Sequence, residues 1–488
     1  MSQSFDVIIL GSGPAGQKAA LNAAKLGKRV ALIDRVDSLG GVCIHTGTIP
    51  SKAMHEAVLH LTGMTLRQVY GDNYTVKDNI TMGDLLYRCQ HVVRTETEVI
   101  RSQMRQSRVD VFYGVAQFTG PHTVSVTAAD GQRTELYGHY ILVAVGTEPA
   151  RPANVPFTPG RVIDSTEFLS LTELPRSMTI VGGGVIGTEY ACMMAAVGVK
   201  VTMVESRPRL MEFIDEELSE ALQFRLREGG VRLRLGESVA KIEVHGNDVV
   251  ATMASNKEIH SHTLLYCIGR QGATANLGLD KAGLTADNRG RLKVNDHFQT
   301  DVPHIYAAGD VIGFPALAAT SMEQGRLAAN HMFRRYSEGT SPLYPLGIYT
   351  IPEISLVGQT EQQLTAAGIP YEVGIARYRE IARGQLISDP NGLLKLLFHP
   401  QSRRLLGVHA IGTGATELIH IGQTVMAAGL PIDYFVESVF NYPTLAECYK
   451  VAAQDGINRL RELPGADDVV LDDATLPEDE GGEDKIAA

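Results

Sequence analysis

The chain has 488 residues, which is enough for about three domains of roughly 150 residues each. Apolar residues make up 44% of it and charged residues 20%, as in ordinary globular proteins, and no apolar run reaches the roughly 18 residues of a membrane-spanning helix, so we expect no membrane partner. The net charge of −11 comes mostly from the segment 465–488, which holds nine acidic residues and one basic residue, so the rest of the surface does not predict nucleic-acid binding.

The chain begins with a predicted strand, a glycine-rich turn, a helix and a second strand. The strand over 6–10 is short, follows no basic segment and ends in glycines, so it predicts a buried strand rather than a signal peptide, and we expect a cytoplasmic protein. The turn contains Gly11, Gly13 and Gly16, with Pro14 and Ala15 between the last two. A helix over 17–26 and a strand over 29–33 follow, and this strand ends at Asp34.

The same unit recurs in the middle of the chain. A strand over 178–181 meets Gly182, Gly184 and Gly187, and Val185 and Ile186 separate the last two glycines. After a helix rich in Ala and Met, the strand 200–204 ends at Glu205, so that 23 residues separate the first glycine from the acid in both copies. One G-x-G-x-x-G pattern is a weak signal, but two copies in the same strand–helix context predict two dinucleotide-binding units.

Each glycine of this pattern has a physical task. The first makes a tight turn, the second lets the backbone approach a pyrophosphate, and the third lets the helix pack on the strand. The pyrophosphate then lies against free N–H groups at the positive end of the helix. The acid at the end of the second strand is placed to accept hydrogen bonds from ribose hydroxyls. Two dinucleotides on one chain imply a redox exchange between them.

Later segments assign FAD to the first unit and leave the second for NAD(H) or NADP(H). A strand over 140–145 is capped by a turn, and the run 300–310 predicts a strand ending at Asp310, which suits the polyol linker of FAD. The helix predicted over 317–325 starts toward the flavin. The predicted organisation is a first FAD part at 1–150, an NAD(P) domain at 151–272, a second FAD part at 273–343, a C-terminal domain at 344–464 and an acidic disordered tail at 465–488.

These residues resemble the pyridine nucleotide–disulphide oxidoreductase family, which includes dihydrolipoamide dehydrogenase and glutathione reductase. The resemblance extends to about residue 463 and rests on both glycine turns and on the segments 146–149, 269–270, 306–310 and 350–358. It implies an α/β fold with two Rossmann-like dinucleotide-binding domains, for FAD and NAD(P), and an α+β C-terminal dimerisation domain. A homodimer or higher homo-oligomer is therefore expected.

The resemblance also implies which residues bind the cofactors. The expected FAD-binding residues are Gly11, Gly13, Pro14, Ala15, Gly16, Asp34, Arg35, Gly41, Cys43, Thr48, Lys52, Gly146, Thr147, Asp310, Leu317 and Ala318. The expected NAD(P)-binding residues are Gly182, Gly184, Val185, Ile186, Gly187, Glu189, Glu205, Arg207 and Gly269. No metal site is expected, because the five cysteines lie far apart and none forms a C-x-x-C pair.

Two departures from the family pattern concern thiol chemistry. The family's disulphide motif has two cysteines five positions apart before Pro-Ser-Lys; here Cys43 is the first, but Thr48 replaces the second, and a hydroxyl forms no disulfide. The family's disulphide reductases also carry a catalytic His before a Pro-Thr pair; here Tyr442 replaces it, while the later Glu447 remains. The two losses belong together, because without a dithiol the His has no proton to move.

With the thiol groups changed and both nucleotide sites intact, the chain resembles the soluble, Si-specific NAD(P) transhydrogenases of this family. The resemblance implies that hydride passes from NADPH to N5 of FAD and then to NAD⁺, reversibly and at one nicotinamide site. Three alternatives stay open: a dihydrolipoamide dehydrogenase-like thiol reductase, an NAD(P)H diaphorase or oxidase, and a nucleotide-binding redox sensor that signals through the acidic tail.

Five side chains are implied as catalytic. Lys52 is expected near flavin N5, paired with Glu189, so that the ammonium stabilises negative charge on the reduced ring. Thr48 either hydrogen-bonds the flavin or fills the space of the missing cysteine. Tyr442 and Glu447 either contact the partner's flavin edge or stabilise the subunit interface.

The remaining thiols and the coenzyme preference are less constrained. Cys43 is expected to be a packed remnant, and a bridge to Cys448 of a partner is disfavoured, because adjacent helix positions point about 100° apart, so Glu447 and Cys448 cannot both face the flavin. Glu205 favours the free 2′-hydroxyl of NAD and repels the 2′-phosphate of NADP. Arg207 and Arg209 either grip that phosphate or lie as solvated surface charge.

Overall fold

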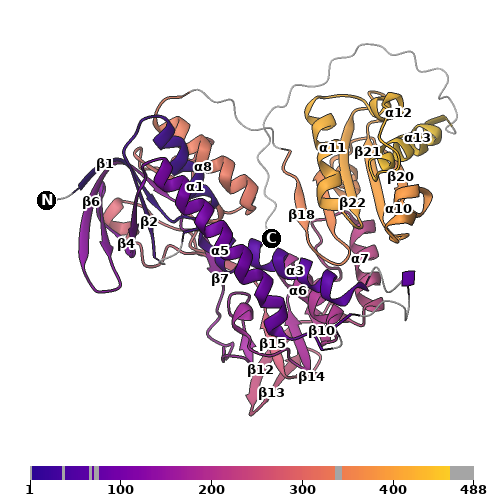
Figure 1. Cartoon of the computed structure of the whole chain (residues 1–488), viewed down its shortest axis with the longest axis horizontal. Coiled ribbons are helices and arrows are strands. Elements are labelled where there is room, and N and C mark those ends of the chain that lie inside the picture. Colours follow the sequence, from indigo (N-terminus) through magenta and orange to yellow (C-terminus); the bar gives the residue numbers. More distant parts are fainter. Residues whose placement is uncertain are drawn as a thin grey trace.

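We describe the fold from a computed structural model, which places residues 3–35, 39–64, 69–70, 76–77, 79–335 and 343–461. The segment 465–488, predicted to be disordered, lies outside these residues. Within them the chain forms an N-terminal, a second and a C-terminal unit, each around its own main sheet (Figure 1).

The N-terminal unit has a seven-stranded sheet in the order β3-β2-β1-β6-β5-β4, with β17 paired to β6. Its strands are β1 (Gln3–Leu10), β2 (Val30–Asp34), β3 (Asp110–Tyr113), β4 (Val115–Gly120), β5 (Thr123–Thr127), β6 (Arg133–Val143) and β17 (Ile305–Ala307). β1 runs parallel to both β2 and β6. Both faces of these strands are covered, which is why 7–10 and 30–33 are continuous buried apolar runs rather than alternating patterns.

Helices from both ends of the N-terminal unit pack together on its sheet. α1 (Pro14–Lys25) and α8 (Ala318–Met332) lie side by side, with the long α5 (Met82–Gln106) next to them (Figure 1). Gly325 permits this close approach, because a Cβ there would lie 2.1 Å from the carbonyl oxygen of Ala15. The start of α1 therefore packs against the middle of α8.

The second unit has a five-stranded parallel sheet in the order β11-β10-β9-β15-β8. Its elements are β8 (Val162–Ile163), β9 (Ser177–Val181), α6 (Val185–Ala196), β10 (Lys200–Glu205), α7 (Glu216–Glu228), β11 (Arg232–Leu235) and β15 (Thr263–Tyr266). A separate antiparallel sheet contains β12 (Val239–His245), β13 (Asp248–Met253) and β14 (Glu258–Ser261), and a two-stranded one contains β7 (Thr147–Pro149) and β16 (Arg270–Gly272).

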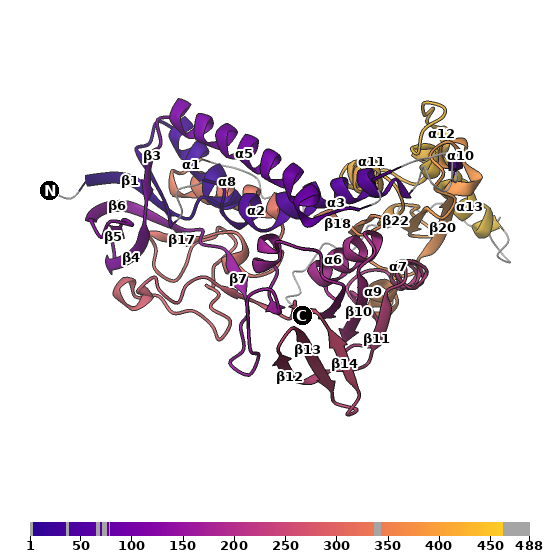
Figure 2. The same cartoon turned by 60° about the horizontal axis from the view of Figure 1, so that its bottom comes forward.

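Two helices after the first glycine turn lead from the N-terminal unit to the second unit. These are α2 (Gly41–His45) and α3 (Thr48–Thr62). α6 is apolar on nearly every side, and residues 187–194 are all buried, because α6 lies between its own sheet and α3. Figure 2 shows α3 against α6, with β18 (Leu346–Ile348) of the C-terminal unit beside them.

The C-terminal unit has an antiparallel sheet in the order β18-β19-β22-β21-β20. Its strands are β18 (Leu346–Ile348), β19 (Ile354–Gly358), β20 (Glu372–Arg377), β21 (Leu393–Phe398) and β22 (Leu405–Ile411). Its helices are α9 (Glu361–Ala367), α10 (Ala382–Leu386), α11 (Ala415–Ala427), α12 (Asp433–Glu437) and α13 (Glu447–Arg461). β21 is buried along its whole length, with α11 and α13 packed on the sheet.

The predicted fold class is confirmed: two Rossmann-like units are followed by an α+β unit. One predicted strand is shorter than expected. The run 300–310 forms a strand only over Ile305–Ala307, because Ile305 N donates to Val302 O in a turn that precedes it. Asp310 then begins a short 3-10 helix after Gly309, whose φ is +82°.

Candidate functional site

The first glycine of each turn lets a neighbouring strand pass close by. Gly11 has φ +103°, and a Cβ on it would lie 2.3 Å from the Ala144 carbonyl oxygen. Gly182 has φ +111°, and a Cβ on it would lie 3.0 Å from the Cys267 carbonyl oxygen. Both positions therefore require glycine for conformation and for space.

In both turns the third glycine allows close helix–strand contact, and the second glycine leaves open space beside the backbone. A Cβ at Gly16 would lie 1.9 Å from the Gly11 oxygen, and one at Gly187 would lie 2.1 Å from the Gly182 oxygen, so helix and strand touch there. A Cβ at Gly13 or Gly184 would meet no described atom within 4 Å. Within the described chain no side chain caps α1 or α6 at these residues, so the helix N–H groups face open space.

The acids that end the second strands are tied to their own turns. Asp34 accepts hydrogen bonds from the Ser12 N–H at 2.9 Å and from the Ser12 hydroxyl. Glu205 accepts one from the Gly183 N–H at 2.6 Å. Ser12 and Gly183 occupy equivalent positions, so each carboxylate orders the turn beside it.

A cavity of about 820 Å³ opens at the edge of the N-terminal sheet, where α1 and α8 begin. It is lined by most of the residues expected to bind FAD: Gly11, Gly13, Pro14, Ala15, Asp34, Arg35, Gly41, Cys43, Thr48, Gly146, Thr147, Asp310 and Ala318. Three expected residues lie elsewhere. Gly16 packs against the turn, Leu317 is the N-cap residue of α8, and Lys52 pairs with α6.

Several lining residues were missed from the sequence. They include Gly114 between β3 and β4, Val115 and Ala116 at the start of β4, Arg151 shortly after β7, and Asp164 and Thr166 just after β8. Asp164 is almost fully buried and pairs with Arg151, whose Nη2 lies 2.7 Å from its Oδ2. No motif marks these residues, because they meet only where the two units touch.

A partly buried arginine connects three of the predicted segments. Arg270 follows Gly269 and donates from Nε to the Thr147 hydroxyl and from Nη2 to the Thr147 carbonyl, both over 2.8 Å. The Thr147 hydroxyl donates in turn to Asp310 Oδ2 over 3.3 Å. Burial lowers the pKa of Arg270, while Asp310 and other nearby carboxylates raise it. The structure thus ties Arg270 to Thr147 and, through it, to Asp310, and the last two residues line the cavity.

The thiol region contains one cysteine and one threonine. All five cysteines lie within the described residues and are free. Burial raises the pKa of the Cys43 thiol, although a hydrogen bond with the Thr48 side chain and the charge of Lys52 lower it. Cys43 and Thr48 therefore touch, as the two cysteines of a dithiol would, but only one of them carries sulfur.

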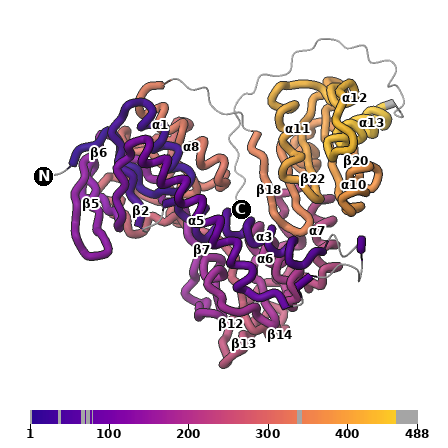
Figure 3. The backbone as a smooth tube through the Cα atoms, in the orientation of Figure 1, coloured from indigo at the N-terminus to yellow at the C-terminus, as the bar shows by residue number. Residues whose placement is uncertain are grey.

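Lys52 and Glu189 form the expected ion pair. The Lys52 ammonium donates to both Glu189 oxygens, at 2.8 and 2.7 Å. Glu189 comes from α6, where it is buried, and Lys52 comes from the second turn of α3. α3 lies against α6 (Figure 3), and this packing brings the two residues together.

The C-terminal candidates lie apart from this pair within the protomer. Tyr442 is exposed over 74% of its surface. Glu447 begins α13, and among the described residues no group hydrogen-bonds its buried Oε2 atom. Cys448 is fully buried in the C-terminal core, and burial raises its pKa to about 12. That burial agrees with the expectation against a Cys43–Cys448 bridge between subunits.

Both arginines near Glu205 are paired. Arg207 donates from its backbone N–H and from Nε to Glu205 Oε1, at 2.9 and 3.0 Å. Burial raises the pKa of Glu205, but the Arg207 and Gly183 hydrogen bonds outweigh it and lower the pKa overall. Arg209 pairs with Glu216 at the start of α7. Neither arginine is an isolated solvated charge.

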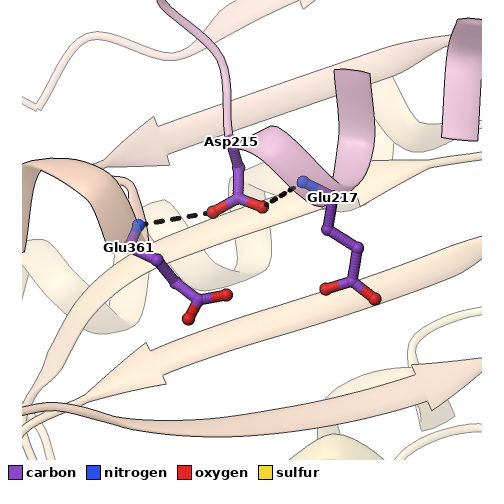
Figure 4. Close-up of side chains that lie close together, drawn as sticks. All are labelled: Asp215, Glu217 and Glu361. Carbon is purple, nitrogen blue, oxygen red and sulfur yellow. Dashed lines mark hydrogen bonds between the residues drawn. The ribbon is translucent and has the colours of Figure 1, made fainter. Parts of the chain in front are cut away.

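One acidic cluster away from the cavity has the spacing of a metal site. Asp215, Glu217 and Glu361 lie close together where α7 meets α9 (Figure 4). The ammonium of Lys395, which is fully buried, hydrogen-bonds all three: Asp215 at 2.9 Å, Glu217 at 3.0 Å, and Glu361. The cluster is therefore an ion-pair network between the second and C-terminal units, with a lysine at its centre.

No helix among the described residues is both long and apolar enough to cross a bilayer.

Known proteins match this arrangement over almost the whole chain. Residues 5–325 match the pyridine nucleotide-disulphide oxidoreductase family, and residues 344–453 match its dimerisation domain. A soluble pyridine nucleotide transhydrogenase of Mycobacterium bovis (strain BCG / Pasteur 1173P2) is 54% identical over 462 residues, covering 94% of this chain and 99% of the relative. One of Colwellia psychrerythraea is 44% identical over 463 residues, covering 94% and 99%.

Solved structures agree. The HOCl-induced flavoprotein disulfide reductase RclA from Escherichia coli superposes with a TM-score of 0.83 at 29% identity, covering 92% of this chain and 99% of that one. LpdA from Mycobacterium tuberculosis superposes with a TM-score of 0.85 at 26% identity, covering 93% and 99%. The two glycine turns, the shared fold and the family matches lead to one conclusion: the chain belongs to the pyridine nucleotide-disulphide oxidoreductase family.

Proposed function

We propose that the chain is a flavin-dependent NAD(P) transhydrogenase, which moves hydride between NADPH and NAD⁺. The observation that carries this proposal is the pairing of two open glycine turns with a Cys43–Thr48 contact in place of a dithiol. Relatives at 54% and 44% identity that are named soluble pyridine nucleotide transhydrogenases support it. A thiol reductase of the dihydrolipoamide dehydrogenase type needs a second sulfur where Thr48 stands.

FAD fits the 820 Å³ cavity on the chemistry of its lining. We place the pyrophosphate at Gly13 and the uncapped start of α1, where N–H groups and the helix dipole favour an anion. Asp310 also lines the cavity, hydrogen-bonded by Thr147, and is placed to accept hydrogen bonds from hydroxyls of the polyol linker. When bound, FAD supplies a two-electron store that accepts hydride from one nicotinamide coenzyme and donates it to the other.

The nicotinamide coenzymes bind in turn at the second glycine turn. Gly184 leaves space for a pyrophosphate at the uncapped start of α6, as Gly13 does at α1. One such turn in this unit means one coenzyme site, so the two coenzymes alternate. Val185, Ile186 and Gly269 border this site by their places in the chain.

Lys52 does not line the cavity itself, but its charge lowers the pKa of Cys43, which does, so we place the ammonium beside the flavin ring. The ammonium is kept in place by both oxygens of Glu189, which is buried on α6. An ammonium fixed before the reaction stabilises negative charge that grows on the ring without reorganising water.

Cys43 takes no part in electron transfer. Burial raises its pKa, so the thiol stays protonated at neutral pH, and the thiolate is the reactive form. Thr48 fills the position of the second sulfur and hydrogen-bonds Cys43. The Thr48 side chain therefore points at the Cys43 thiol and maintains the shape of the pocket.

Arg207 lets one site accept both coenzymes. With NAD⁺ bound, Glu205 accepts hydrogen bonds from the ribose hydroxyls. With NADP⁺ bound, Arg207 turns from Glu205 to the 2′-phosphate. The Arg207 side chain is 37% exposed, so it has room to move, while the Gly183 N–H keeps Glu205 in place.

We further propose a homodimer in the cytoplasm. The segment matching the family's dimerisation domain exposes large apolar side chains, Val439 over 95% and Tyr442 over 74% of their surface, which a second copy would cover. Five free thiols suit a reducing compartment. Tyr442 and Glu447 would then lie at the subunit interface.

The deciding experiment is hydride transfer from NADPH to thio-NAD⁺ by the purified, FAD-loaded protein, with oxygen uptake and quinone reduction measured in parallel. Fast transfer with slow oxygen uptake supports the proposal. Reduction of oxygen or quinone that outpaces transfer would instead identify a diaphorase or oxidase. A chain that ends at Pro464 tests the redox-sensor alternative: turnover should be unchanged.

A further inference from the structure

One residue of the C-terminal unit touches both members of the ion pair. Tyr349 directly follows β18, and its backbone N–H donates to Glu189 Oε1 over 2.9 Å. The Lys52 Nζ atom lies 4.9 Å from the centre of the Tyr349 ring. A cation at this distance over an aromatic face is attracted to it, and more strongly where water is excluded.

Neighbouring contacts hold this tyrosine against the other two units. The ring of His55, one turn beyond Lys52 on α3, meets the Tyr349 ring edge-on, with centroids 6.0 Å apart and planes at 82°. His55 Nε2 lies 3.1 Å from the Thr350 carbonyl oxygen. The Cys192 thiol of α6 hydrogen-bonds the backbone of Ile351. The segment 349–351 is therefore fixed to α3 and α6 at several points.

The far end of the tyrosine reaches into the C-terminal unit. Its hydroxyl hydrogen-bonds the side chain of Thr416, the second residue of α11. Thr416 Oγ1 donates to Glu353 Oε2 over 2.7 Å. Burial raises the pKa of Tyr349, so the hydroxyl remains a neutral donor. The ring thus has one edge anchored on α11 and one face against Lys52.

We propose that Tyr349 is a positioning residue for the Lys52–Glu189 pair, and that through it the C-terminal unit sets where the ammonium lies. The proposal rests on the proposed function. Lys52 has a long, flexible side chain, and the two Glu189 oxygens alone leave it free to approach from either side. The Tyr349 ring closes one side, and the backbone N–H fixes Oε1, so a single arrangement remains.

The two contributions of Tyr349 can be separated by substitution. Every residue except proline keeps the backbone N–H, so substitutions test the ring and the hydroxyl alone. Tyr349→Phe keeps the ring face and removes the hydroxyl. Tyr349→Leu removes the ring, and Tyr349→Met fills the same space without a π face. Tyr371→Leu is a matched control, since Tyr371 is in the same unit and its hydroxyl contacts Thr365 on α9.

Two measurements on the FAD-loaded protein test the role. The first is the rate constant of flavin reduction at saturating NADPH, with the KM for NADPH. The second is the flavin midpoint potential by dye equilibration, which uses no nicotinamide. Tyr349→Leu should reduce the rate constant about five- to tenfold with KM within twofold. The flavin midpoint potential should fall by up to about 30 mV, which for a two-electron couple corresponds to a tenfold weaker preference for the reduced flavin. Tyr349→Phe and Tyr371→Leu should stay within twofold of the natural protein.

The outcomes separate the two proposals. If Tyr349→Leu and Tyr349→Met keep the natural rate and potential while Lys52→Met loses both, Tyr349 only fills space and the inference is wrong. Equal losses in Tyr349→Phe and Tyr349→Leu would overturn it too, because the hydroxyl would then be responsible. Should Tyr349→Leu not fold, Tyr349→Met carries the same test. If the natural protein transfers no hydride to thio-NAD⁺, the proposed function fails, while the shift in potential still decides the role of Tyr349.

Discussion

Lys52 and Glu189 are 137 residues apart in the sequence, yet the lysine ammonium lies 2.8 and 2.7 Å from the two carboxylate oxygens. The pair exists because α6 is apolar on nearly all sides and is therefore buried under α3. Glu189 is the exception on that helix, and a carboxylate buried without a cation costs several kcal/mol. The same packing that stabilises the fold thus fixes the position of the charge that we propose acts on the flavin.

Glu189→Gln should slow flavin reduction by NADPH about 10- to 100-fold, because the ammonium loses the group that orients it. The free energy of unfolding should fall by about 3 kcal/mol, since Lys52 is left partly buried and unpaired. Stopped-flow absorbance at 450 nm and urea denaturation measure the two effects. In the double variant Lys52→Met with Glu189→Leu, stability should recover while the rate stays low. Recovery of the rate as well would show that the charge is not needed.

Anaerobic titration with NADPH should consume about one equivalent per FAD, because no dithiol accompanies the flavin. Thr48→Cys places a second sulfur in contact with Cys43 and should raise consumption toward two equivalents, with a long-wavelength thiolate–flavin band. Thr48→Ser is the control and should leave one equivalent. Two equivalents in the natural protein would reveal another reducible group and contradict the assignment of Cys43 as unreactive.

Coenzyme selection should depend on Glu205 and Arg207 in opposite ways. In Glu205→Ala, NAD⁺ binding should weaken by about tenfold while NADP⁺ binding holds or improves, because ribose acceptors and a repelling charge are lost together. In Arg207→Ala, NADP⁺ should weaken by about tenfold and NAD⁺ should change less than twofold. Titration calorimetry of each variant with NAD⁺ and with NADP⁺ measures the four dissociation constants, which are compared with those of the natural protein. Unchanged selectivity in both variants would remove this pair from the site.

Much of this arrangement follows from local sequence. Both glycine turns, their strands and the acids that end them could be predicted, because each feature is set by residues within 23 positions of one another. The Lys52–Glu189 pair came from resemblance alone. Its geometric cause, the burial of α6 under α3, depends on contacts between units that no period or spacing encodes.

The features that sequence reasoning missed share this origin. Arg270 belongs to the segment 269–270 that carried the resemblance, but its hydrogen bonds to Thr147 were not predicted. No motif marks Tyr349, which lies against Lys52. The segment 300–310 was wrongly extended as a strand, because its apolar residues do not show that Ile305 closes a turn onto Val302. In each case the contact that determines the local structure is made with a residue distant in sequence or with a backbone group, and neither can be read from the local pattern of side chains.

The network around Lys395 gives a prediction about stability. Asp215 caps α7 through the Glu217 N–H at 3.2 Å and also accepts from the Glu361 N–H of α9 at 3.3 Å, so one carboxylate joins helices of two units (Figure 4). Lys395→Met leaves that buried charge without its cation and should lower the free energy of unfolding by about 3–5 kcal/mol. Adding Asp215→Asn keeps a capping oxygen and should recover part of the loss.

The stability that Lys395→Met loses should depend on pH in a direction set by the pKa shifts of Asp215 and Lys395. Burial raises the pKa of Asp215, but His409 and Lys395 outweigh it, so the pKa lies below 3.8. The carboxylate's contribution is therefore complete above about pH 4 and disappears as pH falls through the folded pKa. Burial lowers the pKa of Lys395, but its three carboxylates raise it above 10.5, so this contribution is complete below that pH and disappears above it. Urea denaturation of the natural protein and Lys395→Met should give a constant difference between about pH 5 and 9, shrinking toward both extremes. A difference that persists undiminished at pH 3 would mean that lost packing, not charge, destabilises the variant.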